Sequence, residues 1–255
     1  MRARQKFDGL SDDYDLHRPR YPEEFFATIA AELTSFAEVT AVDTGAGTGI
    51  ALEGLVPALD TSTRYLAVDV SQDMVDKGRR KFPEAEWTVG GAEEFLEGLP
   101  QRVQLVVAAQ AYQWMDRKRY VSACLTALVP GGLLAIMQNN RDHTSSAFLD
   151  AYESLLEEHS PGYGRGYRDF DIRAEVAAGF EPSGGRVDTR VVHWTRPMRV
   201  DDFVRMASSS TQVQRAIAEE GEGFLDLVRG LCSEHARDGA LDVAYTSELF
   251  LGVRG

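Results

Sequence analysis

The stretch VTAVDTGAGTGIALEGL, Val39 to Leu55, decides the fold of this 255-residue chain. Three glycines at alternate positions separate a short apolar run from a segment with helical periodicity. Glycines in such a turn let the backbone come close to a ligand, and the N-terminus of the following helix favours an anionic group. The sequence therefore predicts a strand, a ligand-binding turn and a helix.

Composition narrows the class of protein. The chain is 44% hydrophobic and 26% charged, as is usual for a globular protein, and its net charge of −13 argues against a basic groove for nucleic acid. No apolar run is long enough to span a membrane, and the N-terminus lacks the apolar core of a signal peptide. We expect a soluble, cytoplasmic protein that binds neither nucleic acid nor membrane, as a monomer or weak homodimer.

The two cysteines suggest no metal site. Cys124 and Cys232 are far apart in the sequence and have no metal-ligand residues at a useful spacing. Both fall in helical patterns, so we expect buried free thiols and no bound metal.

Apolar runs alternate with helical patterns through the first 142 residues. Strands are expected at residues 39–43, 64–70, 86–90, 103–110 and 133–138, and helices at residues 21–36, 49–59, 72–82, 92–99 and 117–128. Strands that are apolar on both faces and alternate with helices indicate a parallel sheet covered on both sides.

The last hundred residues follow another pattern. Helices are expected near residues 146–158, 172–178, 200–206 and 224–237, and strands at residues 186–194 and 243–253. The predicted fold is α/β: a doubly wound, mostly parallel, seven-stranded Rossmann-like sheet, with helices on both faces and helical insertions in its C-terminal part.

Two known glycine motifs do not fit the turn. A phosphate loop would need Gly-Lys-Ser/Thr, which is absent, and Ile50 stands where the dinucleotide fingerprint needs its third glycine. Asp69, twenty residues after Gly49, ends the second strand, where an acid can accept both hydroxyls of a ribose. An acid at this place suits NAD and other adenosyl cofactors alike, so the glycine turn and Asp69 indicate an adenosyl cofactor and leave its identity open.

Four segments together resemble the class I S-adenosylmethionine-dependent methyltransferases. These are VDTGAGTG (residues 42–49), VDVSQDM (68–74), GGAEEF (90–95) and VVAAQAYQWMD (106–116). With LVPGGLLAIMQNNRD (128–142) and YDLHRPRYP (14–22), the chain is similar to the trans-aconitate methyltransferase-like branch, also called methyltransferase type 11. The motif resemblance covers residues 7 to 142.

The resemblance implies one domain over residues 1–255. It would comprise an N-terminal lid and first helix (1–36), a cofactor-binding core (37–142), and a sheet edge whose helical insertions shape the acceptor pocket (143–255). The cofactor would be S-adenosyl-L-methionine, with S-adenosyl-L-homocysteine as product. The implied cofactor-binding residues are Tyr14, Arg18, Asp43, Gly45, Ala46, Gly47, Asp69, Val70, Met74, Ala92, Glu93 and Gln110.

Candidate residues on the acceptor side are fewer. His17 and His143 are candidate general bases, needed only if the acceptor must lose a proton. Gln113 stands where related sequences often have histidine; it cannot act as a base but can hydrogen-bond an acceptor.

Three further residues are candidates for substrate binding. Of Tyr112 and Trp114, we expect one to face the acceptor and the other to lie in the core. Arg141 could bind an acceptor carboxylate or, equally, form an ion pair with an acid on a helix.

The predicted function is methyl transfer from S-adenosylmethionine to a small molecule, with an oxygen acceptor, a carboxylate or a hydroxyl, slightly favoured. Two alternatives keep the cofactor: an enzyme of this fold with a non-methylating reaction, and a non-catalytic binding protein. A nicotinamide-dependent oxidoreductase fits least, because Ile50 interrupts its fingerprint.

Overall fold

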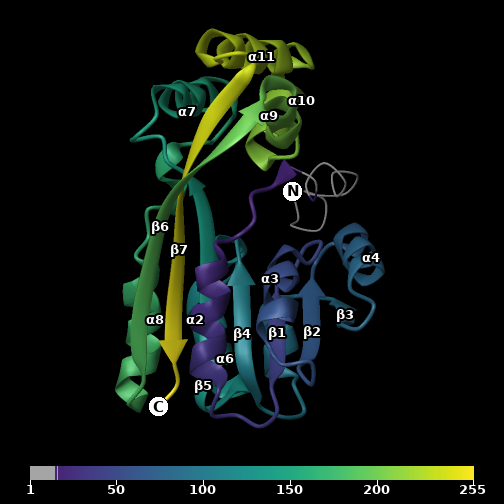
Figure 1. The fold of residues 1–255 in the computed structure, drawn as a ribbon, viewed down its shortest axis with the longest axis vertical. Helices are drawn as coiled ribbons and strands as arrows, with labels where there is room; N and C mark the ends of the chain where they lie inside the picture. Colours follow the sequence, from purple (N-terminus) through teal and green to yellow (C-terminus); the bar gives the residue numbers. More distant parts are fainter. Residues whose placement is uncertain (1–14, 16) are drawn as a thin grey trace.

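Seven strands form one sheet, in the order β3-β2-β1-β4-β5-β7-β6, in a computed structural model that describes Asp15 and residues 17–255 (Figure 1). The first five strands are parallel, and β7 runs antiparallel between β5 and β6. The strands are β1 Thr40–Thr44, β2 Arg64–Asp69, β3 Glu86–Val89, β4 Val103–Ala109, β5 Leu128–Arg141, β6 Arg186–Arg199 and β7 Ala240–Val253. The predicted fold class is confirmed.

Helices cover both faces of the sheet because successive strand residues point to opposite sides. Ala41 packs in one buried cluster and its neighbour Val42 in the other. The first cluster includes residues of α2 (Glu23–Leu33), α3 (Ile50–Ala58) and α4 (Gln72–Lys81). The second includes residues of α5 (Ala92–Glu97), α6 (Arg117–Ala127) and α8 (Ile172–Phe180).

A third buried cluster builds a helical cap beyond the sheet. The helical cap consists of α7 (Ala147–His159), α9 (Val200–Ser208), α10 (Thr211–Glu220) and α11 (Gly223–His235) (Figure 1). Pairing of β5 with β7 reaches Arg141 opposite Tyr245, whereas β6 and β7 stay paired as far as Arg199 opposite Ala240. The long hairpin thus carries the helical cap past the carboxyl ends of the parallel strands.

The bounds differ most from the predictions in the C-terminal half. Each of β5, β6 and β7 is longer than its apolar pattern, because cross-strand hydrogen bonds continue over polar residues. α10 was not predicted, since its buried face consists of only Thr211, Val213 and Ala216. The first helix is shorter than predicted and spans Glu23–Leu33.

The part of the chain that the structure describes contains no helix with both the length and the apolar character needed to cross a membrane.

Two helical glycines differ in their surroundings, so replacing each by alanine should change the free energy of unfolding in opposite directions. A Cβ atom on Gly54 of α3 would lie 2.1 Å from the Phe26 ring on α2, whereas one on Gly230 of α11 would meet no atom within 4 Å. We expect Gly54→Ala to lower the free energy of unfolding by about 1–3 kcal/mol through overpacking. Gly230→Ala should raise it by about 0.5–1 kcal/mol, because alanine loses less backbone entropy in a helix.

Urea unfolding of both variants beside the parent measures these changes. An unchanged or higher stability of Gly54→Ala would contradict the close packing of α2 on α3.

Candidate functional site

A pocket of about 590 Å³ lies at the carboxyl ends of β1, β4 and β5. Its walls also include residues of α7, of α10, of the short 3₁₀ helix η3 (Arg165–Arg168) and of the N-terminal segment. Because β1 pairs with β2 on one side and with β4 on the other, strand order reverses here. In doubly wound sheets, ligands bind at such a point.

The glycine turn (residues 45–49) forms the floor of the pocket. Gly45 and Gly47 line it and have φ angles of 66° and 56°, a region that side chains disfavour. A Cβ atom on Gly45 would also lie 2.5 Å from the Cβ atom of Ala111. The Gly45 and Ala46 amides donate to the Val68 carbonyl oxygen, at 2.8 and 3.1 Å. Backbone therefore faces the pocket in a fixed conformation.

Asp69 ties the glycine turn to the neighbouring strand. Its Oδ2 accepts a hydrogen bond from the Gly47 amide and its Oδ1 one from the Ser71 amide, both at 2.9 Å. Burial nevertheless raises the pKa of Asp69 above its ordinary value, against the effect of these hydrogen bonds. Each oxygen keeps a lone pair, so the carboxylate can still accept from a ligand.

Asp43 is a buried acid behind the glycine turn. Neither of its carboxylate oxygens has a hydrogen-bond partner among the described residues. Burial, reinforced by the charge of Asp69, raises the pKa of Asp43 to about 7. A buried acceptor of this kind suits a cationic group of a ligand.

Two glutamines, Gln110 and Gln113, bring further hydrogen-bond acceptors to the pocket. Gln110 follows β4 with a φ angle of 54°, uncommon for a residue other than glycine and often found at functional positions. Its Nε2 donates to the Asn139 carbonyl oxygen at 2.5 Å, and Nε2 of Gln113 donates to the Gln110 carbonyl oxygen at 2.8 Å. Both Oε1 atoms are buried without a hydrogen-bond partner, and both residues line the pocket.

Several predicted cofactor residues are not in the pocket wall, and these include Asp43 and Asp69 as well as the residues expected around the adenine. Met74 and Ala92 are buried in the packing of α4 and α5, and Val70 is half-buried. Glu93 accepts a hydrogen bond from the Asp116 amide at 2.8 Å. Tyr14 lies outside the described residues.

The acceptor-side candidates separate into pocket and core. Trp114 lines the pocket and is 44% exposed. Tyr112 is in the core instead: its ring packs edge-on against Tyr120, and its hydroxyl donates to Glu175 at 2.8 Å. Of the pair, only Trp114 therefore lines the pocket.

Two of the three charged or titratable candidates line the pocket, and the third does not. His143 and Arg141 line the pocket, and Arg141 forms a buried ion pair with Glu153 of α7 at 3.0 Å. His17 is buried in the N-terminal segment and is not among the lining residues.

Many lining residues were not predicted from the sequence, and among them are Gln138, Glu153, Tyr163 and Arg168. Gln138 ends the predicted fifth strand, and the glycine-rich, basic stretch around Arg168 carried no periodic pattern. The other two belong to a helical insertion whose sequence gives no motif.

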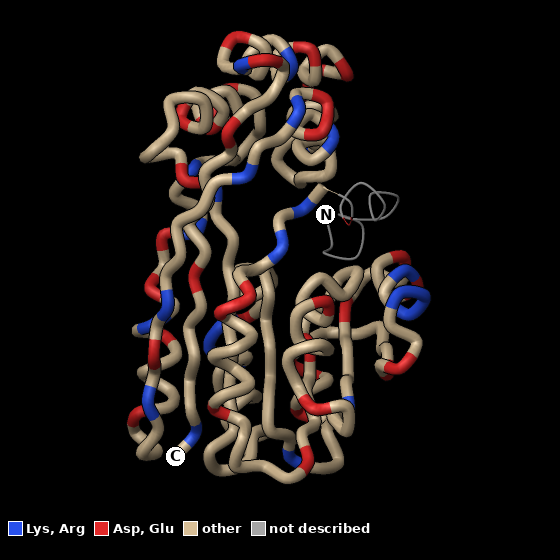
Figure 2. Tube along the Cα trace, in the orientation of Figure 1, with Lys and Arg blue, Asp and Glu red and all other residues tan. Residues whose placement is uncertain are grey.

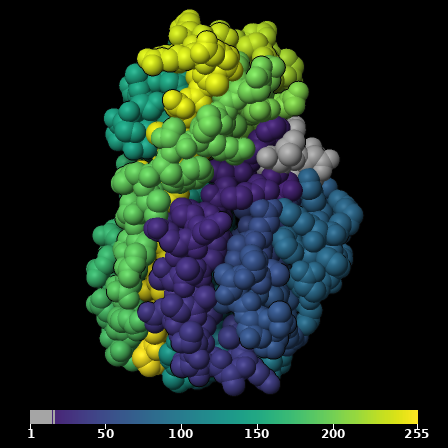
Figure 3. Space-filling model, in the orientation of Figure 1, coloured from purple at the N-terminus to yellow at the C-terminus, as the bar shows by residue number. Residues whose placement is uncertain are grey.

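An N-terminal strap (Asp15 and residues 17–22) lies across the edge of the site. Its backbone passes between the helical cap and the sheet core, and basic residues mark it there (Figures 2 and 3). Arg18, Pro19 and Tyr21 line the pocket.

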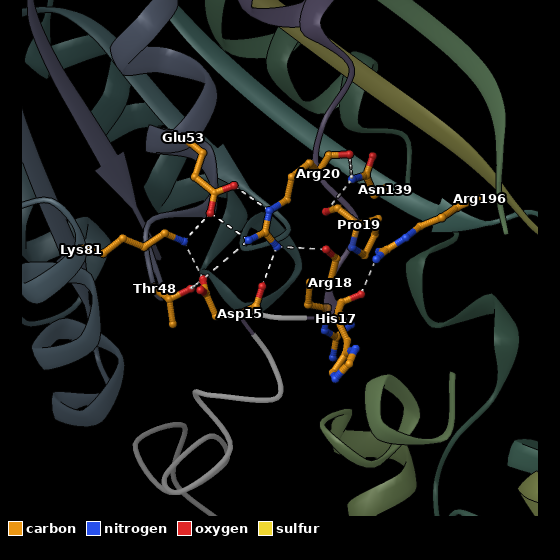
Figure 4. A network of polar contacts seen from close by, with 10 residues as sticks. All are labelled: Asp15, His17, Arg18, Pro19, Arg20, Thr48, Glu53, Lys81, Asn139 and Arg196. Atoms are coloured by element: carbon orange, nitrogen blue, oxygen red, sulfur yellow. Dashed lines mark hydrogen bonds and ion pairs between the residues drawn. The ribbon is translucent and has the colours of Figure 1, made fainter. Parts of the chain in front are cut away.

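The strap is bound on the cofactor side. Asp15 accepts a hydrogen bond from the Thr48 hydroxyl of the glycine turn and forms an ion pair with Lys81, both at 2.7 Å (Figure 4). Arg20 forms a two-point ion pair with Glu53 of α3, at 2.6 and 2.8 Å.

The strap is also bound on the side of the helical cap and β5. Arg196 of β6 donates to the His17 carbonyl oxygen at 3.0 Å (Figure 4). Asn139 donates to the carbonyl oxygens of Pro19 and Arg20, at 3.3 and 3.2 Å. One short segment therefore joins both sides of the pocket.

Comparison with known proteins supports this picture. Residues 41–132 match the family described as "Methyltransferase domain". An uncharacterized methyltransferase of Schizosaccharomyces pombe, C25B8.09, is 27% identical, over 92% of this chain and 94% of its own.

Two solved structures share the fold. A proposed type II methyltransferase of Anaeromyxobacter dehalogenans superimposes with a TM-score of 0.67 at 22% identity, covering 93% of this chain and 97% of its own. A SAM-dependent methyltransferase of Thiobacillus denitrificans, in complex with S-adenosyl-L-homocysteine, gives 0.55 at 17% identity over the full length of both chains.

The narrower resemblance to the trans-aconitate branch stays a prediction, as do the roles of individual residues. The four motifs, the matching domain, the methyltransferase relative and the shared fold agree at the level of the class. The chain is a class I methyltransferase that uses S-adenosyl-L-methionine as its cofactor.

Proposed function

We propose that this enzyme methylates a small molecule, on an oxygen atom, inside the pocket between the glycine turn and the helical cap. The observation that carries the proposal is the continuity of this pocket, which runs from Gly45 and Gly47 to Arg168 and Gln212. Its volume of about 590 Å³ lies within the usual range for small-molecule sites, about 300–1,000 Å³.

The proposed cofactor contacts follow from the groups that face the turn. Asp43 would bind the ammonium group of the methionyl part, because it is a buried acceptor without a partner. The backbone of Gly45, Ala46 and Gly47 would lie beneath that part, and Asp69 would accept from the ribose hydroxyls.

Three groups of residues complete the proposed cofactor site. Val70, Met74, Ala92 and Glu93 would surround the adenine, Gln110 would border the methionyl part, and Tyr14 and Arg18 would close over the site.

The cofactor supplies an electrophilic methyl group on a positively charged sulfur, so the protein has to align and desolvate the acceptor rather than activate the donor. The unpartnered Oε1 atoms of Gln110 and Gln113 give this end of the pocket a negative potential that suits the positive charge. Trp114 and the strap would exclude water from the reacting atoms.

An oxygen that is already ionised fits the remaining titratable groups. Glu153 is held by the Arg141 ion pair and by the Tyr163 hydroxyl, so it is poorly placed to accept a proton. A carboxylate acceptor loses no proton at neutral pH. His143, which lines the pocket, would be the base for a hydroxyl acceptor.

The test is mass spectrometry of small carboxylic acids, phenols and amines incubated with the protein and S-adenosylmethionine that carries a deuterated methyl group. We expect one acceptor to gain a single labelled methyl group. Asp69→Ala should weaken cofactor binding by about tenfold or more, because a buried hydrogen-bonding carboxylate is lost. Glu86→Ala, which removes only an exposed ion pair on β3, is the matched control.

A product without added mass from a consumed acceptor would favour the non-methylating alternative. Cofactor binding without any turnover across the panel would favour a binding protein. Failure to bind the cofactor at all would contradict the proposed site.

The pKa of Asp43 predicts how cofactor binding depends on pH. The carboxyl is largely protonated below about pH 7 in the free protein, and an ammonium group bound beside it favours the ionised form. Binding therefore releases a proton, and the affinity for S-adenosylhomocysteine should rise several-fold as the pH rises from about 6 to about 7.5. Calorimetry on Asp43→Asn should lose this dependence, whereas Asp242→Asn, at an exposed position on β7, should keep it.

The same shift has a separate consequence for the free protein. The folded-state pKa is raised from 3.8 to about 7, so the folded state binds more protons than the unfolded chain between these values. Stability should therefore fall as the pH rises through this range, and Asp43→Asn should remove that part of the fall. A parent protein that gains stability over this interval because of Asp43 would contradict the assignment.

The contacts of the strap predict that it slows the dissociation of the bound cofactor product. Asp15 and Arg20 hold the strap against the glycine turn and α3, through ion pairs that are partly buried. Asp15→Ala and Arg20→Ala should each speed the dissociation of S-adenosylhomocysteine by about fivefold, as expected for an interaction near 1 kcal/mol. Stopped-flow displacement measures this rate, and Arg186→Ala, which removes an exposed ion pair with Glu32, serves as control. Equal rates in all three variants would mean that the strap does not cover the cofactor.

A further inference from the structure

Arg168 is a cation in the far wall of the pocket whose charge no acid of the described chain neutralises by an ion pair. It ends η3, and its guanidinium carbon lies 4.8 Å from the centre of the Tyr167 ring. Its Nη1 donates to Oδ1 of Asn140, whereas its Nε is buried without a hydrogen-bond partner. Burial lowers the pKa of Arg168 below its usual range, and the positive charges of Arg141 and Arg18 lower it further.

Two neighbouring arginines show the contrast. Arg141 is paired with Glu153 at 3.0 Å, and Arg165 is paired with Asp150 and Glu157, at 2.6 and 2.7 Å. A buried charge without a counter-ion costs several kcal/mol, by the general estimate for ions taken out of water. A chain can retain such a charge where a ligand supplies the missing counter-ion.

The surroundings of Arg168 provide hydrogen-bond donors. Asn140 accepts a hydrogen bond from Arg168 and donates one to Oε1 of Gln138 at 3.0 Å. The other amide atom of Gln138, Nε2, is buried without a hydrogen-bond partner. The one carboxylate of β7 in the pocket wall, Glu248, is hydrogen-bonded to Asn140, and burial raises its pKa. The buried side-chain nitrogens without a hydrogen-bond partner on this side are thus Nε of Arg168 and Nε2 of Gln138.

The opposite end of the pocket has the reverse character. Its unpartnered atoms are the Oε1 acceptors of Gln110 and Gln113, beside the glycine turn. Crossing the sheet from the turn on β1 to Asn140 on β5 passes two strand spacings, or about 10 Å. Hydrogen-bond acceptors therefore lie near the turn, where the positively charged sulfur would bind. Hydrogen-bond donors lie about 10 Å from the turn, across the sheet.

We propose that Arg168, together with Gln138, binds an anionic group of the acceptor that is not the group being methylated. The proposal rests on the function proposed above and narrows its substrate class. The acceptor carries an oxyanion, a carboxylate or a phosphate-like group, at a distance from the oxygen that receives the methyl group. Arg168 is then a specificity-determining residue that sets which end of the acceptor meets the cofactor.

Calorimetry on the complete chain saturated with S-adenosylhomocysteine tests the proposal. The probes are the monomethyl esters of the dicarboxylates from succinate to suberate, which imitate a methylated product with one free carboxylate. Each is compared with the ester in which that carboxylate is a carboxamide. At least one half-ester should bind about tenfold more tightly than its neutral counterpart, since it supplies the counter-ion of a buried cation.

Arg168→Gln should abolish this preference, and Arg168→Lys should restore only part of it, because lysine lacks the planar set of donors. Arg165→Gln is the matched control: it removes a cation from the same 3₁₀ helix, but one that acids already neutralise. The same chains ending in a phosphonate show which oxyanion the subsite prefers.

Thermal melting separates a ligand-binding role from a structural one. Arg168→Gln removes a partly buried charge that has no acid partner in the described part of the chain, so the free variant should melt no lower than the parent. Arg141→Gln should melt lower, because it leaves Glu153 buried without its cation.

Three results would overturn the proposal: no half-ester binds, the preference persists in Arg168→Gln, or Arg165→Gln loses the preference equally. In each of these, cofactor binding and labelled methyl transfer can persist, and the proposed function then stands alone. A protein that fails to bind S-adenosylhomocysteine would remove both.

Discussion

The site depends on the pair of hydrogen bonds by which Asp69 ties the glycine turn to the start of α4. A turn with left-handed residues at Gly45 and Gly47 has many accessible conformations, and its amides could point elsewhere. The carboxylate at the end of β2 holds the Gly47 amide and, with its other oxygen, the Ser71 amide that precedes α4. The turn after β1 and the turn after β2 are thereby set relative to each other at the point where strand order reverses.

Charge is distributed along the pocket in one direction. Near the turn the unsatisfied groups are acceptors, on Asp43, Gln110 and Gln113, and across the sheet they are donors, on Arg168 and Gln138. Unpaired buried polar groups destabilise a fold unless a ligand completes them, so their arrangement describes the ligands. A cation at one end and an anion at the other would satisfy both sets. Such a polar gradient orients an acceptor before any bond changes, which is the main contribution a protein makes to transfer from an already activated donor.

The fold was largely predictable from the sequence, and the acceptor half of the pocket was not. Parallel strands and their helices follow from local apolar patterns, and the resemblance covers the same residues. Three features depend on contacts between distant segments and could not be read from local pattern. They are the two hydrogen bonds that Asp69 accepts from the turns, the core position of Tyr112 and the lack of an acid partner for Arg168 among the described residues. Arg141 illustrates the limit: the sequence left an acceptor carboxylate and a helix acid as equal partners, and only the tertiary structure shows that Glu153 of α7 is the acid paired with it. The length of β6 and β7 and the weakly apolar α10 were missed for the same reason, since pairing and burial, rather than local pattern, stabilise them.

The N-terminal strap gives the two halves a common boundary. It holds the glycine turn, α3 and α4 through Asp15 and Arg20, and it is held by Arg196 of β6 and Asn139 of β5 on the other side (Figure 4). A displacement of the strap would break contacts on both sides at once, because the two sets of anchors lie within six residues of each other along the chain. In the proposed function the cofactor and the acceptor share this wall, so a ligand that stabilises the strap in this position would favour binding of the other. The strap would then couple the two proposed sites through its own anchors, without any direct contact between the two ligands.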